Sequence, residues 1–343
     1  MITQTLTRAS RELFRRAPDE RFPTVDALLA HCRREKDESL DRWHPPAALT
    51  PTATADARLG LAAGGDGPFA LNDWSFGQLC GLARVGKETV NRLAPDTAAR
   101  VFRETLPGGN KPLQLLTRGD GVRSVHGTAY TRLPNADLVG MLAEVATDFQ
   151  PPQTGVAGGT GLYCGEQDLF CFLIDPAGWA EVGDQAFAPG FFVWNSEVGK
   201  RSVGVQTFWF QAVCANHIVW DAVEVIDFSR KHTANVAGAL GEIRRHVEAL
   251  ARKRDERRDG FVRVVRRAMG QALGADAEEA MKELVKHGLT RTLARQAVES
   301  VAGGRFTLFA LVDALTRLAQ QAEYAGDRTA LDVQAAALFT LAA

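Results

Sequence analysis

The sequence has no apolar run near the roughly 20 residues that a membrane-spanning helix needs. The segment from Met1 to Arg16 is amphipathic and carries four arginines. It lacks the apolar core and the small-residue cleavage site of a signal peptide. We therefore expect a cytoplasmic protein with no membrane partner, in which this segment forms a surface helix.

Cysteine is scarce and is not arranged as a disulfide framework. An odd number of cysteines at irregular spacing, in a chain of 343 residues, argues against paired cross-links. Apolar residues flank each of them, which is typical of reduced, buried thiols in a reducing compartment. The five are Cys32, Cys80, Cys164, Cys171 and Cys214.

Several motifs that carry chemistry are also missing. Cys214 and His217 have a C-x2-H spacing, but no second close pair of ligands accompanies them, so we predict no metal site. No G-x-S-x-G elbow surrounds Ser196, and no lysine follows the glycines at 158–161 as a phosphate loop requires. We expect no cofactor and no catalytic residues, which favours a protein that is not an enzyme but leaves the question open.

The patterns that are present predict an α+β fold, with an antiparallel sheet built from β-hairpins, flanking helices and a helical C-terminal part. Glycine-containing turns separate strand-like segments around residues 119–121 and 165–167, and a longer polar turn does so at 195–199. We predict an N-terminal helical extension at 1–43, a linker at 44–68, an α+β core with three hairpins at 69–231 and a helical C-terminal region at 232–343.

The third turn is the most informative stretch of the chain. Asn195-Ser-Glu-Val-Gly199 separates Gly190–Trp194 from Val203–Cys214, and both flanking segments are apolar or alternate as strands do. A polar turn between buried strands is a candidate for function, and its backbone groups need partners. We expect it at an edge of the main sheet, with Asn195 and Ser196 hydrogen-bonding to backbone. Further polar residues of uncertain role are Glu197, Asn216, His217 and His232.

Charge is balanced overall but not locally. The formal net charge is −1, whereas ten basic residues and four acidic ones between Arg244 and Arg267 leave that stretch at +6. We predict that these cations form part of a nucleic-acid interface, because phosphate neutralisation needs only clustered cations. The local surplus of positive charge would also be explained by a solvated helix with salt bridges, or by an ion-pair network between helices or subunits. The residues of the predicted interface are Lys200, Arg201, Arg230, Lys231, Arg252, Lys253, Arg254, Arg257 and Arg258.

Several short motifs follow one another along the chain: Trp74–Leu106, Tyr130, Leu133–Leu138, Asn195–Gly199, Cys214–Asn216, Arg230–Thr233 and Ala314–Arg317. Their order resembles the phage/plasmid-like family known as domain of unknown function 932. The resemblance covers roughly residues 70 to 340, and the chain departs from it at His217, where a small glycine is common. It implies a protein of a mobile element, similar in outline to the single-strand annealing proteins of phage recombination.

These observations favour a non-enzymatic, homo-oligomeric protein that binds or anneals single-stranded DNA. Aromatic side chains near the turn could stack on bases if they are exposed, although core packing suits most of them. One alternative is a hydrolase or nuclease centred on Glu197, His217 and His232. Another is an interaction scaffold of phage defence or anti-defence, in which the arginines pair subunits. The aromatic candidates are Trp194, Trp209, Phe208 and Phe210.

Overall fold

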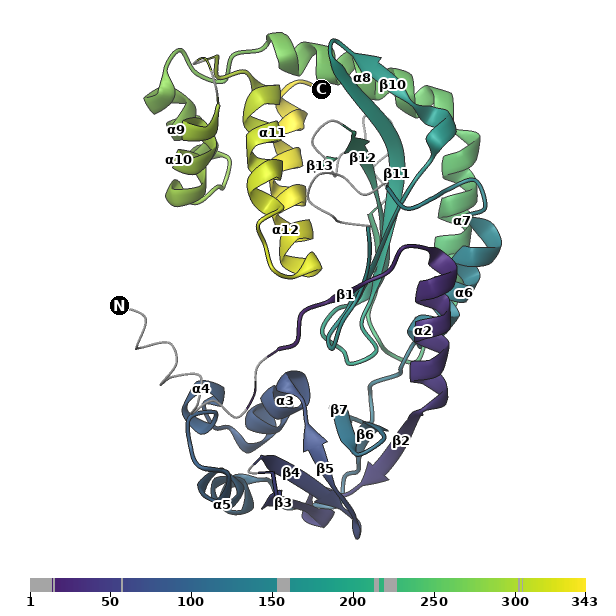
Figure 1. Ribbon diagram of the computed structural model, residues 1–343, viewed down its shortest axis with the longest axis vertical. Helices are drawn as coiled ribbons and strands as arrows, with labels where there is room; N and C mark the ends of the chain where they lie inside the picture. Colours follow the sequence, from purple (N-terminus) through teal and green to yellow (C-terminus); the bar gives the residue numbers. More distant parts are fainter. Residues whose placement is uncertain are drawn as a thin grey trace.

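The computed structural model describes residues 14, 16–56, 58–152, 161–212, 216–218, 227–301, 303 and 305–343, with only the backbone described at 216–218 and 227. Two β-sheets carry helices on their faces, and the chain from Ala239 onward is helical (Figure 1). The predicted α+β class with a helical C-terminal part is confirmed. The first 13 residues, where we expect a surface helix, lie outside the described chain.

The large sheet contains two of the three predicted hairpins. Its strands run in the order β1-β8-β9-β11-β12-β13, with β10 beside β11 and β14 beside β12, and every pair is antiparallel. Val193 pairs with Val205, which is the register expected when the turn closes two alternating strands. The strands are β1 (Glu20–Arg21), β8 (Leu162–Cys164), β9 (Leu169–Ile174), β10 (Ala180–Val182), β11 (Gln185–Asn195), β12 (Val203–Gln211), β13 (Asn216–Ile218) and β14 (Asp227–Arg230).

The small sheet corrects the predicted linker. Residues 44–68 include two complete strands and the start of a third, and Leu59 and Leu61 are fully buried in the core. The proline and glycine content concealed this: Pro51 lies on edge strand β3, where a missing N–H is tolerated. The order is β2-β6-β7-β5-β4-β3. The strands are β2 (Ser39–His44), β3 (Leu49–Ala53), β4 (Leu59–Ala63), β5 (Asp66–Leu71), β6 (Leu113–Arg118) and β7 (Gly121–Gly127).

The predicted boundaries at 43 and 68 therefore cut through one sheet. Strand β2, which we expected to be helical, pairs along its length with β6 of the first predicted hairpin. The helical extension is thus limited, in the described chain, to α2 (Val25–Asp37), which the Thr24 hydroxyl caps by accepting from the Ala27 N–H at 3.1 Å. Long-range strand pairing decided this region, and no local pattern reveals it.

The C-terminal region predicted at 232–343 is helical from Ala239 onward in the described residues, and Lys253 separates its first two helices, α7 and α8. The helices are α3 (Asp73–Ala83), α4 (Lys87–Val90), α5 (Pro95–Thr105), α6 (Asn135–Val145), α7 (Ala239–Arg252), α8 (Arg254–Gly270), α9 (Ala277–Lys286), α10 (Arg291–Ser300), α11 (Leu308–Ala319) and α12 (Ala325–Ala336), with short 3-10 turns at Pro46–Ala48, Pro176–Gly178, Val236–Gly238 and Ala337–Leu341.

Both faces of the large sheet are covered, and alternation along β11 distributes its side chains between them. Phe191 and Val193 pack with α2, α6 and α7 on one face. Phe192 and Trp194 pack on the other face with Ala325 and Val333 of α12. A sheet covered on both faces needs apolar residues at successive positions, which explains why β11 has no polar side chain between Ala186 and Trp194.

Candidate nucleic-acid interface at a buried turn

The turn between β11 and β12 is buried, although it is polar. Asn195 and Ser196 have no exposed surface, and their side chains bond to backbone as predicted. The Asn195 amide donates to the Leu133 carbonyl at 2.8 Å, and the Ser196 hydroxyl donates to the Gln167 carbonyl at 2.5 Å and accepts from the Lys200 N–H at 2.8 Å. The turn lies at the end of two central strands, not at an edge strand as expected.

Glu197 ties this turn to the small sheet. Its carboxylate forms an ion pair with Arg123 of β7 at 3.0 Å and accepts the Asn135 N–H, at the start of α6, at 2.6 Å. Its backbone carbonyl accepts from the Tyr130 hydroxyl at 2.7 Å and from the Arg132 guanidinium. Because Glu197 is only 5% exposed, this pair is shielded from water and the loss of either partner would leave a buried charge.

The network extends beyond the turn. The second amino group of Arg123 lies 3.4 Å from a carboxylate oxygen of Glu35 on α2, and Arg118 of β6 also bonds Glu35. Two elements of the small sheet, one helix and the turn of the large sheet therefore share one set of charges. Of the predicted motif residues, Asn195, Ser196 and Glu197 are thus structural residues that hold the turn.

A cavity of about 490 Å³ opens next to this turn, and we call it the cationic pocket. It brings Lys200 and Lys231 together, as well as Arg201, so cations predicted from two separate segments converge here. Lys200 and Lys231 are exposed, whereas Arg230 does not line the cavity and lies over the Phe228 ring at 5.4 Å. The lining residues are Gly127, Ala129, Tyr130, Gly199, Lys200, Arg201, Ser202, Lys231, His232 and Thr233.

A stack of three rings supports the cationic pocket. The His126 ring lies 3.7 Å from the Tyr130 ring at 9°, and Tyr130 lies 5.4 Å from His232 at 25°. Burial, aided by the charge of Arg132, lowers the pKa of His126 to about 4, and burial also lowers the pKa of His232. Both rings are therefore neutral near pH 7. Sequence reasoning missed His126, and it noted Tyr130 only for the family resemblance.

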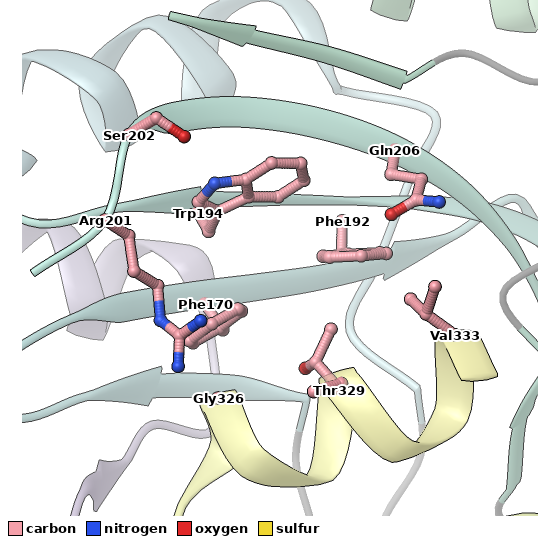
Figure 2. Close-up of a pocket in the computed structure, with 10 residues that line it drawn as sticks. Phe170, Phe192, Trp194, Arg201, Ser202, Gln206, Gly326, Thr329 and Val333 are labelled. Atoms are coloured by element: carbon pink, nitrogen blue, oxygen red, sulfur yellow. The ribbon is translucent and has the colours of Figure 1, made fainter. Parts of the chain in front are cut away.

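A second cavity, of about 500 Å³, lies on the α12 side of the large sheet, and we call it the aromatic pocket (Figure 2). Trp194 is half-buried there, 5.3 Å from the Phe192 ring, with Thr329 and Val333 of α12 opposite (Figure 2). Its residues are Phe170, Phe192, Trp194, Arg201, Ser202, Gln206, Gly326, Thr329, Ala330 and Val333. Of the four aromatic candidates, Trp194 alone is available, since Trp209, Phe208 and Phe210 are buried in the core.

The two pockets are adjacent, because Arg201 and Ser202 line both of them. A buried carboxylate fixes Arg201: its Nε lies 2.7 Å from Asp168, which is 2% exposed. The guanidinium carbon lies 5.4 Å from the centre of the Phe170 ring. This arrangement places an aromatic face and a cluster of cations side by side, with a held arginine between them.

The basic tract of α7 and α8 is less available than we expected. Arg252 and Lys253 are exposed, but Arg257 is 2% exposed and its guanidinium lies 3.5 Å from the Gly190 carbonyl. Arg254 pairs with Asp175 across to the large sheet. Arg258 forms ion pairs with two neighbouring residues, Asp255 at 2.9 Å and Asp259 at 3.0 Å. Two of these five basic residues are exposed, and the other three lie against the large sheet or against neighbouring carboxylates.

The remaining predicted residues cannot be placed in a site, because their side chains lie outside the described part of the chain. Asn216 and His217 belong to β13, where they pair with Gln211 and Phe210 of β12, and their side chains are not described. Cys214 and most of the glycine-rich loop, at 153–160, lie outside the described residues. Among the described helices, none is both long and apolar enough to cross a membrane.

Comparison of the chain with protein-family models, curated proteins and solved structures finds no match. The resemblance to the phage/plasmid-like family stays a prediction. The two pockets and the turn at 195–199 are therefore the features of this protein that bear on its function.

Removing the carboxylate of Glu197 should destabilise the fold. We expect Glu197→Ala to lower the free energy of unfolding by about 3–5 kcal/mol, because Arg123 would stay buried without its main partner. The measurement is urea unfolding followed by tryptophan fluorescence, with exposed Glu181→Ala as the control. Adding Arg123→Met should recover part of the loss; a change below about 0.5 kcal/mol in the single variant would contradict the assigned role.

Stability should fall with acid through the histidine stack. Since the folded-state pKa of His126 is depressed from 6.5 to about 4, the unfolded chain binds its proton first, and stability is lost as the pH falls through that window. We expect His126→Phe to flatten the stability profile between pH 6.5 and 4, measured by denaturant midpoints. His287→Gln, on the surface just after α9, is the control and should leave the slope unchanged.

Proposed function

We propose that this protein binds single-stranded nucleic acid, with an unstacked base in the aromatic pocket and the adjoining backbone phosphate on the cationic pocket. The observation that carries the proposal is that Arg201 and Ser202 line both pockets. A nucleotide has the same two parts, one flat and apolar and one anionic, directly linked. Surfaces that combine stacking faces with a positive groove are typical of single-strand binders.

The chemistry of the aromatic pocket favours single strands over duplexes. A base can stack on the Trp194 ring only if its faces are free, which duplex stacking prevents. Stacking tolerates any base, so we expect weak sequence preference. Lys200 and Lys231 are exposed, and they neutralise phosphate without reading sequence.

The alternatives have weaker support in the geometry. A hydrolase centred on Glu197 would need a free carboxylate, whereas this one holds Arg123 and the Asn135 N–H. The scaffold alternative requires the arginines of the basic tract of α7 and α8 to pair subunits. It is less favoured, because Arg254 and Arg257 pack against the large sheet of the same chain. The family resemblance alone supports three further parts of the proposal: that the protein forms homo-oligomers, that its natural ligand is DNA and that it comes from a mobile element.

The proposal predicts that binding depends on the pockets and not on the basic tract. Fluorescence anisotropy with a labelled oligothymidylate should show wild-type binding that weakens as salt rises. Trp194→Ala should weaken it by about 5- to 150-fold, the value of one stacked base. Lys200→Gln with Lys231→Gln should reduce the slope of log affinity against log salt by about 1.4, for two phosphate contacts.

Matched surface variants control for nonspecific effects. Trp43 is 48% exposed on β2, and Lys282 on α9 is also exposed, so Trp43→Ala and Lys282→Gln should leave affinity unchanged. Absence of binding by the wild type at low salt would defeat the proposal. So would a loss confined to Arg252→Gln with Lys253→Gln, which would move the interface to the basic tract.

A further inference from the structure

A third cavity, of about 370 Å³, contains a cluster that the two pockets do not use. His31 and Glu35 lie one turn apart on α2, and Cys164 lies opposite them on β8, so we call these residues the α2–β8 triad. Nitrogen, oxygen and sulfur donors thus meet in one place. Glu20, Arg118 and Arg123 also line this cavity.

The spacing of the donor atoms fits a transition metal. One donor from each residue lies within 4.8 Å of the other two, and His31 Nε2 lies 3.7 Å from Glu35 Oε2. In tetrahedral zinc sites, bond lengths of 2.0–2.3 Å separate the donors by about 3.3–3.6 Å. Movements of less than about 1 Å would therefore close the α2–β8 triad around an ion.

Neighbouring groups surround these donors. The Glu20 carboxylate lies 3.7 Å from His31 Nδ1, on the other ring nitrogen from the Nε2 that lies near Glu35. Strand pairing puts Glu20 directly beside Cys164. Arg118 and Arg123 fix the Glu35 carboxylate from the other side.

We propose that the α2–β8 triad binds one Zn²⁺ per chain, with the cavity supplying the fourth coordination position to water or a small ligand. Binding converts the Cys164 thiol to a thiolate and releases its proton to solvent. We expected no metal on the basis of Cys214 and His217, whereas these ligands come from segments far apart in the chain. The cavity shares no lining residue with the two pockets, although Arg123, which holds the turn through Glu197, also lines it.

Cobalt provides a direct probe of the proposed site. The full chain, reduced and stripped with a chelator, should bind one equivalent of Co²⁺ and develop a thiolate-to-cobalt band in the near ultraviolet, with the visible bands of tetrahedral cobalt. Added Zn²⁺ should displace the cobalt and abolish both the near-ultraviolet band and the visible bands. Cys164→Ser should remove the thiolate band, and His31→Gln should weaken binding. Glu20→Gln, at an exposed side chain 3.7 Å from His31, should weaken it less than His31→Gln does.

The chain offers a matched control. Glu283 of α9 and His287, the residue that follows this helix, are also four residues apart, with His287 Nε2 3.9 Å from a Glu283 oxygen, but no cysteine is grouped with them among the described residues. His287→Gln should leave cobalt binding unchanged. Failure of the wild type to bind stoichiometric Co²⁺ or Zn²⁺ would overturn the proposal. A thiolate band that persists in Cys164→Ser, or binding unaffected by both His31→Gln and Glu20→Gln, would overturn it equally.

Discussion

The buried ion pair between Glu197 and Arg123 is the constraint on which the arrangement of this protein depends. It joins the end of the central hairpin in the large sheet to β7 in the small sheet, and the same carboxylate receives the first N–H of α6. A buried pair of this kind is a weak source of net stability but a strong source of specificity, because every misplaced partner leaves a charge without water. We infer that it fixes how the two sheets meet.

The consequence is a turn that presents cations from a rigid base. Asn195 and Ser196 anchor the chain on one side, so Lys200 and Arg201 emerge at a defined point between the two pockets. Asp168 holds Arg201, whereas Lys200 and Lys231 are exposed to solvent. Binding of single strands without sequence preference, as we propose, uses a stacking face beside exposed cations. Arg123 also reaches Glu35, so the proposed metal site and the turn share one guanidinium.

Local signals in the sequence were sufficient for the hairpins, for most helices and for the burial of the turn. They failed where distant segments decide the structure. Pro51 and the glycines of 44–68 suggested a linker, yet pairing with other strands makes this segment part of a sheet. Charge counting could not show that Arg257 packs under β11, nor that Lys231 lies beside Lys200. The ring stack of His126, Tyr130 and His232, and the α2–β8 triad, depend on contacts that no spacing encodes.

The central claim is that nucleic acid binds in the adjacent aromatic and cationic pockets. Photochemical cross-linking tests this claim most directly. A single strand carrying 5-iodouracil would be irradiated with the full chain, and the modified peptide would be identified by mass spectrometry. Our account predicts adducts on Trp194, or on Phe170 or Phe192 beside it, and none on exposed Trp43. Adducts confined to the peptides of α7 and α8 that carry Arg252 and Lys253 would contradict it.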